Sequence, residues 1–508
     1  MTAKRGCVIA GALLATSLIA FSQDSLFVYR EVNGLVLGGR PFYAIGVNSY
    51  FLENLVSYGD TTHVGEILRT AKRLGITTVR TWGFFDADDS TDPAVIQFLP
   101  GRYNESGLRA LDYVVARAKE HSIRLIIPLV NNWDDYGGMN QYVRWLARIT
   151  TPERMFQGEE KSAVQKVVGA ANRSYAVQIS STLAHDDFYT NPLLKQWYKD
   201  YVGMVLNRLN TLTGITYKDE PAVLMWELAN EPRSSDRSGS LVSAWVNEMS
   251  TFIKSIDSNH LVGTGEEGHD VSTDSYTEVS SYSNQSWLFD GTAGSSFTLN
   301  TSLPNIDAAS IHCYPEDWGF QPSAAVAWLR DHSRIALRQG KPLVVGEAGI
   351  RQQTNVFFDG FFNAAFAENV SGVLPWQFAY EGRVEPDGFA FSCPDDSNMC
   401  DVLTRYAELY RRRREGMLVP PAAATLYQNY PNPFNYLTVI SFDLPTPGNV
   451  QLHVYNLLGQ RVKTLFDEYS QVGRRAVLFD AVGIASGVYL VRLTTGAGSM
   501  EGKLVLIK

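Results

Sequence analysis

The stretch WELANEPR, Trp226 to Arg233, decides the fold of this chain. It ends the apolar run PAVLMW, 221–226, with a carboxylate, Glu231, directly after an amide, Asn230. The apolar run predicts a buried strand. Pro232 ends the ladder of that strand because proline has no backbone N–H to donate. We therefore expect Glu231 at the C-terminal end of a buried strand.

A second run, PLVVGEAG at 342–349, ends in the same way with Glu347. Between such apolar runs lie segments whose apolar residues have helical spacing, at 106–121, 191–211, 241–255 and 323–339. Strands that alternate with helices predict a (β/α)₈ TIM barrel, in which polar residues at the C-terminal strand ends build the site. We expect its eight strands at 42–50, 77–85, 124–133, 223–231, 261–267, 307–315, 342–348 and 372–379.

The two ends of the chain differ from the barrel pattern. Basic residues precede the short apolar stretch 7–21, which predicts a secretory signal at residues 1–22. That stretch is shorter than the roughly twenty residues of a membrane span, and we expect no other segment to cross a bilayer. The barrel is then expected over residues 23–416.

A linker is predicted at residues 417–424 from their proline and alanine content. Beyond it the apolar residues alternate, in VISFDL, VQLHVYN, RRAVLFDA and GVYLVRLTT. Alternation with turns between the runs predicts a small antiparallel, immunoglobulin-like β-sandwich at 425–508. The pattern alone leaves open whether this domain binds sugar, spaces the barrel or serves as an address.

Composition excludes several classes of function. The chain has 44 Lys and Arg against 53 Asp and Glu, a net charge of −9, and nothing that indicates nucleic acid as a partner. Its histidines and cysteines have no zinc-like spacing, and it has no glycine-rich phosphate loop, so we expect no metal and no cofactor. Cys393 and Cys400 are candidates for a small disulfide ring, and Cys313 for a buried thiol.

Glu231 and Glu347 carry the predicted chemistry. The fourth and seventh strands of a barrel open into one mouth, and a pair of carboxylates there is what acid-assisted displacement at a glycosidic carbon requires. Glu347 would attack the anomeric carbon of the sugar, and it would be kept ionised by the neighbouring cation of Arg80. Glu231 would protonate the leaving oxygen, kept protonated by a neighbouring negative charge. Asn230 is expected to bind the 2-hydroxyl of the reacting sugar.

Other polar and aromatic residues follow the sixth and eighth strands. His312 and Tyr314 alternate, so they point to the same side. His312 is expected to hold Glu231 or a sugar hydroxyl, with a satisfied core histidine as the alternative, and Tyr314 to donate to Glu347. Trp376 is expected to form the floor under the sugar ring, with core packing as the alternative.

Three further glutamates need separate interpretations. Glu227 lies four residues before Glu231 and about 13 Å lower in the barrel, so we expect a structural carboxylate with a basic or hydroxyl partner. Glu266 or Glu267 is expected to contact substrate. The long connections 134–190, with a helix near 161–171, and 268–305 either wall a cleft or decorate the surface.

The motifs WELANEP, HCYPEDWG, VVGEAG and LPWQF resemble those of glycoside hydrolase family 5. Within that family, LVNNWDDYGGMNQYVRW at 129–145, FYTNP at 188–192 and DGTAGSSFTLN resemble its endo-β-1,4-mannanases. The resemblance covers about residues 25 to 415. It implies a retaining hydrolase with Glu231 as acid/base and Glu347 as nucleophile, and with Arg80, Asn230, His312, Tyr314 and Trp376 around the reacting sugar.

The third strand departs from the family pattern. Many members place a histidine after this strand, where this chain has Asn131 and Asn132. We assign Asn132 to substrate contact. The favoured substrates are mannan, glucomannan or galactomannan. A β-1,4-glucanase on the same scaffold and a non-catalytic glycan-binding protein are the alternatives.

The C-terminal segment is similar to the sorting domains of the type IX secretion apparatus. YPNPFN, VYNLLGQRV, ASGVYLVRL and the closing GKLVLIK carry this similarity. It implies export to the medium or cell surface, the secretion apparatus as a partner, and removal of the tail. Sugar binding by this domain becomes the minor alternative.

Overall fold

The computed structural model describes residues 26–150, 183–282 and 286–508. The predicted signal segment at 1–22 and the predicted helix near 161–171 lie outside these residues. Within the described ranges, no helix combines the length and apolar character that crossing a bilayer requires.

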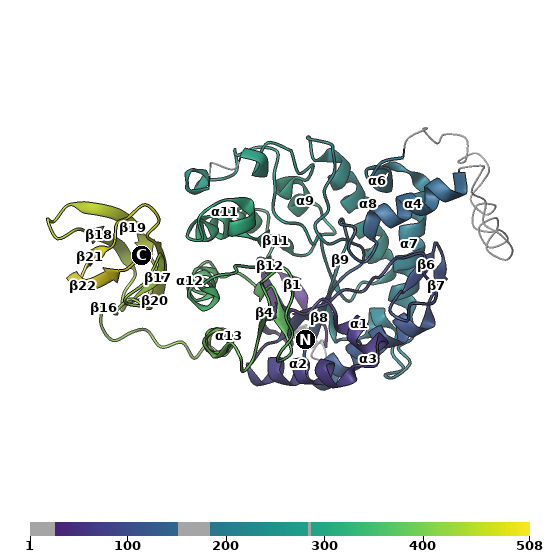
Figure 1. Cartoon of the computed structure of the whole chain (residues 1–508), viewed down its shortest axis with the longest axis horizontal. Helices are drawn as coiled ribbons and strands as arrows, with labels where there is room; N and C mark the ends of the chain where they lie inside the picture. Colours follow the sequence, from purple (N-terminus) through teal and green to yellow (C-terminus); the bar gives the residue numbers. More distant parts are fainter. Residues whose placement is uncertain (1–25, 151–182, 283–285) are drawn as a thin grey trace, which may run out of the picture.

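Eight parallel strands form a closed barrel, which confirms the predicted fold (Figure 1). The strands are ordered β10-β9-β8-β5-β4-β13-β12-β11, and a bridge between Gly263 and Ala308 joins the two ends of this series. All eight match predicted strands. They are β4 (Ala44–Asn48), β5 (Thr78–Arg80), β8 (Arg124–Pro128), β9 (Val223–Glu227), β10 (Leu261–Gly263), β11 (Ala309–Cys313), β12 (Leu343–Ala348) and β13 (Gly372–Pro375).

Each barrel strand is shorter than the apolar run that predicted it. β9 ends at Glu227, four residues before Glu231, so the prediction that this strand reaches 231 is wrong. The backbone beyond β9 is nevertheless fixed, because the N–H of Asn230 donates to Val130 O and that of Glu231 to Gly265 O. Glu231 has a φ of 53°, in the left-handed region that residues other than glycine rarely adopt. The acidic side chain therefore sits on an irregular but hydrogen-bonded segment.

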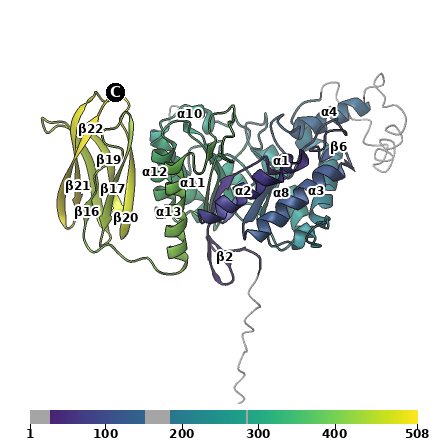
Figure 2. The same ribbon diagram turned by 60° about the horizontal axis from the view of Figure 1, so that its bottom comes forward.

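Helices surround the barrel (Figure 2). The main apolar core is built from side chains of both these helices and the strands. Asn104 and Asn191 cap α3 and α7 by accepting from the N–H groups of Ser106 and Leu193. The predicted helices correspond to α3, α7, α8 and α11. The helices are α1 (Leu52–Ser57), α2 (Thr61–Arg73), α3 (Glu105–Glu120), α4 (Gly138–Thr150), α6 (Asp187–Thr190), α7 (Pro192–Asn207), α8 (Ser240–Ile256), α9 (Phe297–Ser302), α10 (Pro315–Trp318), α11 (Ala324–Arg338), α12 (Thr354–Ala367) and α13 (Ser397–Arg414), with the 3₁₀ turns η1 (Tyr217–Asp219), η2 (Val279–Ser281) and η3 (Ser286–Leu288).

The N-terminal end of the barrel is closed. An antiparallel sheet of β1 (Tyr29–Glu31), β2 (Gly34–Leu37) and β3 (Arg40–Phe42) precedes β4. Its apolar side chains join a buried cluster with residues from the barrel strands, among them Ile126 and Leu224. This end is filled with apolar side chains, so the opposite end is the one that can hold a polar site.

Short strands and one disulfide shape the connections. The strands are β6 (Gln97–Leu99), β7 (Arg102–Tyr103), β14 (Phe378–Ala379) and β15 (Phe391–Ser392). Cys393 and Cys400 form a disulfide that joins the segment after β15 to the first turn of α13, which confirms the predicted ring. Cys313 is a buried free thiol, as predicted.

The C-terminal segment is the predicted antiparallel β-sandwich. One sheet has the order β16-β17-β20 and the other β19-β18-β21-β22, and they enclose a core of their own. Residues 417–420, before it, are exposed and outside regular structure. The strands are β16 (Thr425–Leu426), β17 (Leu437–Leu444), β18 (Gly448–Tyr455), β19 (Arg461–Ser470), β20 (Gly473–Asp480), β21 (Gly487–Thr495) and β22 (Gly498–Leu506).

Candidate active site

An open cleft lies over the C-terminal ends of the barrel strands. Both predicted glutamates face it, although 116 residues (347 − 231) separate them in the chain. The rest of the wall is mostly aromatic or polar. The cleft is lined by Trp82, Asn131, Trp133, Asp135, Asn230, Glu231, Arg233, Glu267, Tyr314, Asp317, Trp318, Glu347, Trp376, Asp387 and Phe389.

Glu347 belongs to β12 and is held by a cation and a phenol. Its Oε1 accepts from Arg80 Nη1 at 2.5 Å, and its Oε2 accepts from the Tyr314 hydroxyl. Arg80 is fully buried and also donates to Glu227 Oε2 at 2.7 Å and to Asn230 Oδ1 at 2.8 Å. The structure confirms both predicted pairings, of Arg80 with Glu347 and of Glu227 with a basic partner. Arg80 itself lies below the cleft surface, so it supports the side chains that line the cleft.

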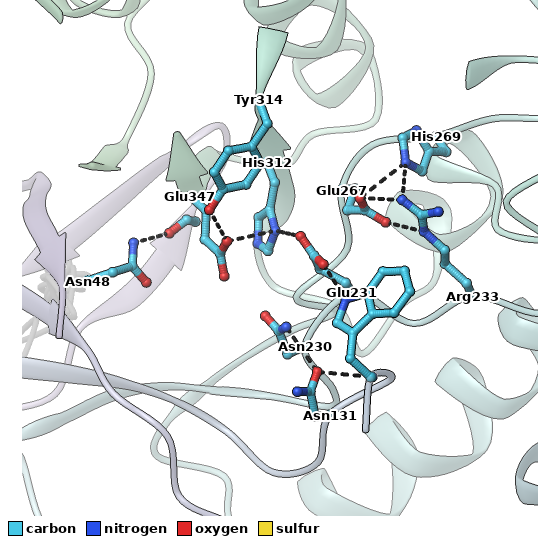
Figure 3. Close-up of polar contacts among 12 residues, drawn as sticks. Asn48, Asn131, Asn230, Glu231, Arg233, Glu267, His269, His312, Tyr314 and Glu347 are labelled. Carbon is cyan, nitrogen blue, oxygen red and sulfur yellow. Dashed lines mark hydrogen bonds and ion pairs between the residues drawn. The ribbon is translucent and has the colours of Figure 1, made fainter. Parts of the chain in front are cut away.

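Glu231 is held by two different groups (Figure 3). Its Oε1 lies 2.7 Å from His312 Nδ1, and its Oε2 accepts from Trp133 Nε1 at 2.6 Å. His312 lies between the two glutamates, with Nδ1 also 3.6 Å from Glu347 Oε2. The structure therefore places His312 where it was predicted to hold Glu231, and burial lowers the pKa of its imidazole.

The two carboxylates are close enough to act on one atom of a ligand. One oxygen of Glu231, one oxygen of Glu347 and one nitrogen of His312 lie within 4.8 Å of one another. Such a group can in principle hold a metal ion. Each of the four carboxylate oxygens already contacts a protein side chain, however, and one of those partners is the cation of Arg80. These residues therefore fit an acid–base pair better than a metal site.

The surroundings of the two carboxyl groups differ. Burial raises the pKa of Glu231 to about 7, and the negative charge of Glu267 adds to this effect. Burial also raises the pKa of Glu347, but the charges of His312 and Arg80 oppose it. The expected protonated state of Glu231 is supported, with one correction. Its main cause is burial, and Glu267 is the negative neighbour that contributes.

A second charged cluster stands beside Glu231. Arg233 donates to both oxygens of Glu267 at 2.6 Å, and its guanidinium lies 5.1 Å from the centre of the Trp133 ring and 5.6 Å from that of Trp287. The charge of Arg233, together with that of His269, lowers the pKa of Glu267 against the effect of its burial. Of the two candidates after β10, Glu267 lines the cleft.

Glu266 has a different environment. It is buried, and it accepts from the Thr264 hydroxyl and the Asn300 amide at 2.9 Å each. Its position outside the cleft lining makes it part of the packing of the connection 268–305. That connection also brings Trp287 against Arg233, which lines the cleft. Part of the connection therefore stands beside the cleft, in agreement with the interpretation that it forms a wall.

Trp376 also lines the cleft. Its ring stacks on Tyr50, with centroids 5.1 Å apart and planes 5° from parallel, and its Nε1 donates to Asp387 Oδ2 at 2.9 Å. The indole is therefore fixed on one face and at its polar edge, and it lines the cleft where a sugar floor was predicted.

The two asparagines after β8 have different environments. The Asn132 side chain accepts from the backbone N–H of Arg233 at 3.1 Å, and it is not among the residues that line the cleft. Asn131 lines the cleft instead and accepts from Asn230 Nδ2 at 3.1 Å. The choice of Asn132 for substrate contact is therefore not supported, and Asn131 occupies the position that can contact a ligand.

Several cleft residues were not singled out from the sequence. Trp133, Arg233, Asp387 and Phe389 lie on irregular segments, where side-chain direction follows no periodicity. Two of them had a local signal, because Trp133 directly follows Asn132 and Arg233 lies two residues after Glu231. Asp387 and Phe389 had none, since they come from the segment between β14 and β15.

Comparisons with known proteins agree with this geometry. The family model described as GH family 5 beta-mannosidase-like matches residues 25–370, and that of the secretion system C-terminal sorting domain matches residues 428–508. The chain is 36% identical over 403 residues to mannan endo-1,4-beta-mannosidase 3 of Arabidopsis thaliana, covering 74% of this chain and 88% of the relative.

Two solved structures are similar as well. The endo-beta-1,4-mannanase from Thermotoga petrophila has a TM-score of 0.66 at 28% identity, covering 92% of this chain and 98% of its own. The endo-1,4-beta-mannanase from Rhizomucor miehei has a TM-score of 0.62 at 30% identity, covering 76% and 99%. The chain therefore belongs to the glycoside hydrolase family 5 β-mannosidase-like family and carries a secretion system C-terminal sorting domain.

Proposed function

We propose that this protein is an endo-β-1,4-mannanase that cleaves internal bonds of mannan, glucomannan or galactomannan with retention of configuration. The similar proteins named above support the substrate class. The observation that carries the mechanism is the closeness of Glu231 and Glu347, with oxygens within 4.8 Å of each other. Retaining glycosidases have carboxyl groups about 5–5.5 Å apart, whereas inverting enzymes need about 6.5–9.5 Å.

The proposed reaction has two displacements. First, Glu231 gives its proton to the glycosidic oxygen while an oxygen of Glu347 attacks C1, so the C1–O bond breaks and a glycosyl ester of Glu347 forms. Then Glu231, now a carboxylate, takes a proton from a water molecule whose oxygen attacks C1 and releases Glu347. The second inversion restores the β configuration.

The surrounding side chains have supporting roles in this proposal. Arg80 and Tyr314 each hold one oxygen of Glu347, and His312 fixes Glu231. Asn230, which Arg80 and Asn131 orient, is the candidate for the 2-hydroxyl of the sugar. Trp376 supplies a flat apolar face beneath the ring.

Substitution of each glutamate tests the assignment. Glu231→Gln and Glu347→Gln should each lower turnover of mannan by about 10²–10⁴-fold or more, while binding of manno-oligosaccharides persists. Glu53→Gln is the matched control, because Glu53 is equally buried but lies outside the cleft, and burial raises its pKa to about 8. Near-parental turnover in either active-site variant would refute the assigned roles.

Two product measurements test substrate and stereochemistry. Release of reducing ends from mannan should far exceed release from carboxymethylcellulose, and the reverse order would favour a β-1,4-glucanase. Proton NMR of the first product should show the β anomer. An α anomer would contradict the double displacement.

The sorting domain directs the protein to secretion, so the protein is extracellular or attached to the cell surface. We further propose that the type IX secretion apparatus recognises residues 428–508. Expression of the full chain in a type IX-competent bacterium should place it outside the cell, and a strain without the apparatus should retain it. Equal export from both strains would exclude this partner.

A further inference from the structure

The sheet β16-β17-β20 of the sandwich has apolar side chains on both faces. Ile440 and Phe442 of β17 point into the core of the sandwich. Leu437 and Val439 alternate with them, so they point outward, and Leu478 of β20 lies opposite Val439. These three outward side chains are buried and belong to the core cluster of the barrel. An antiparallel sheet that faced water on this side would carry polar residues there.

The other sheet of the sandwich shows what a solvated face looks like in this chain. On its outer face Arg492 of β21 pairs with Glu501 of β22 at 2.6 Å, and both side chains are half exposed. Arg492 also lies over the ring of Tyr455. The outer face of one sheet is therefore apolar and that of the other is charged. This difference is expected if the sheet β16-β17-β20 packs against a partner and the other sheet faces water.

That partner is α12, the helix between the sandwich and the barrel (Figures 1 and 2). α12 is apolar around most of its circumference, which is typical of a helix buried on two sides. Toward the sandwich it presents Gly360, where a Cβ atom would lie 3.1 Å from the Cβ of Leu478. The absence of a side chain allows close approach of helix and sheet.

A buried hydrogen bond fixes the register of the two parts. β20 is an edge strand, so some of its N–H groups have no partner within its sheet. The N–H of Ala476 donates to Asn363 Oδ1 of α12 at 2.6 Å, and Asn363 is 95% buried. A buried amide would be costly without this partner.

Charges at the rim match across the same boundary. Arg330 of α11 lies 3.1 Å from Glu468 of β19 and also 3.6 Å from Glu368, beyond the end of α12. The boundary thus has an apolar centre, one buried hydrogen bond and a charged rim, which is the anatomy of a specific protein–protein interface.

We propose that the C-terminal sandwich remains bound to the barrel through α12 when the linker at 417–424 is cut. The linker is open to a protease, since Met417 and Val419 are 54% and 78% exposed. Release of the tail then requires dissociation of the α12 interface in addition to scission. The partner of the outward face of β17 and β20 is the barrel of the same chain.

The test uses the full chain with a protease site inserted in the linker and an affinity tag after Lys508. After cleavage at about 1 μM, the barrel fragment should be retained on the affinity resin and the two fragments should co-elute in gel filtration. Separation of the parental fragments, with both folded by circular dichroism, would overturn the proposal.

Variants on each side locate the contact. Leu478→Glu places a charge in the apolar centre, and Gly360→Leu fills the space that the sheet occupies while favouring the helix. Each should lower the retained barrel fragment at least tenfold after cleavage. Arg492→Ala, on the opposite face of the sandwich, should leave retention unchanged. Parental retention in Gly360→Leu would show that α12 is not the docking surface.

Discussion

The contact between Trp133 and Glu231 makes a sharp prediction about pH dependence. Trp133 Nε1 donates to Glu231 Oε2 at 2.6 Å, and this hydrogen bond favours the ionised carboxylate. Trp133→Phe removes the donor but keeps an aromatic ring over Arg233. The pKa of Glu231 should therefore rise, and the enzyme should keep its proposed acid protonated to higher pH.

The size of the effect follows from the geometry. A hydrogen bond to a charged group is worth about 1.5–3 kcal/mol. Trp133 is 40% exposed, so water replaces part of the lost contact and the lower end applies. Since 1.36 kcal/mol corresponds to one pKa unit, we expect an upward shift of about one unit. In the parent, a pKa of about 7 sets the midpoint of the alkaline limb of kcat/KM plotted against pH. In Trp133→Phe this midpoint should lie near pH 8.

The assay is kcat/KM against pH on a defined manno-oligosaccharide. Overall rates are expected to fall in Trp133→Phe because the ring lines the cleft, so the position of the limb is the readout. Trp82→Phe is the matched control. Trp82 lines the same cleft, and its Nε1 has no hydrogen-bond partner among the described residues, so its limb should not move. Glu267→Gln should move the limb downward, since the charge of Glu267 raises this pKa. A limb that stays in place or moves down in Trp133→Phe would refute the reasoning.

Three further predictions concern stability and the cleft wall. Burial raises the pKa of Glu53 to about 8 from an ordinary 4.5, so its contribution to stability is present below pH 4.5 and is lost as the pH rises through 8. The parent should therefore lose unfolding free energy between pH 5 and pH 8. In Glu53→Gln this loss should be smaller by about 3 kcal/mol, measured by denaturant titrations at the two pH values. Arg351 lies 4.0 Å from the centre of the ring of Phe389, which lines the cleft. Arg351→Ala removes about 0.5–1 kcal/mol of cation–π energy that holds this ring in place, so KM should rise roughly two- to fivefold with little change in kcat. The disulfide restricts the unfolded chain, so removing it in the Cys393→Ser, Cys400→Ser double variant should lower the free energy of unfolding by about 2 kcal/mol, measured by thermal unfolding. An unchanged unfolding midpoint would contradict this reasoning.

The sequence was sufficient for the barrel because each strand has an apolar run long enough to be seen. It overestimated their lengths, as at β9, because apolar side chains continue beyond the regular ladder: Leu228 and Ala229 are buried but lie past Glu227. Periodicity reports burial, and burial does not require a strand. The polar residues at the ends of the runs were found for the same reason, since they interrupt the apolar pattern.

The cleft wall was harder to predict because its side chains come from irregular segments. Asn131 and Asn132 are adjacent and chemically identical, and only the backbone path decides which one faces the cleft. The two-sided burial of α12 was likewise hidden, because its second apolar face is covered by Leu437, Val439 and Leu478, which lie about 80 to 120 residues later in the chain. Contacts at such separations have no local signature.

Arg80 shows how one buried side chain can hold the whole site together. Each of its three guanidinium nitrogens donates a hydrogen bond: Nε to Glu227, Nη1 to Glu347 and Asn48, and Nη2 to Asn230. A lysine carries the same charge at a single point and cannot reach acceptors so arranged. An uncharged side chain would leave two buried carboxylates facing each other without a cation. Because the same fork fixes Asn230 and Glu347, it couples the position of the proposed nucleophile to that of the group proposed to bind the sugar. Arg80 can therefore determine catalytic geometry from below the cleft, without touching the substrate.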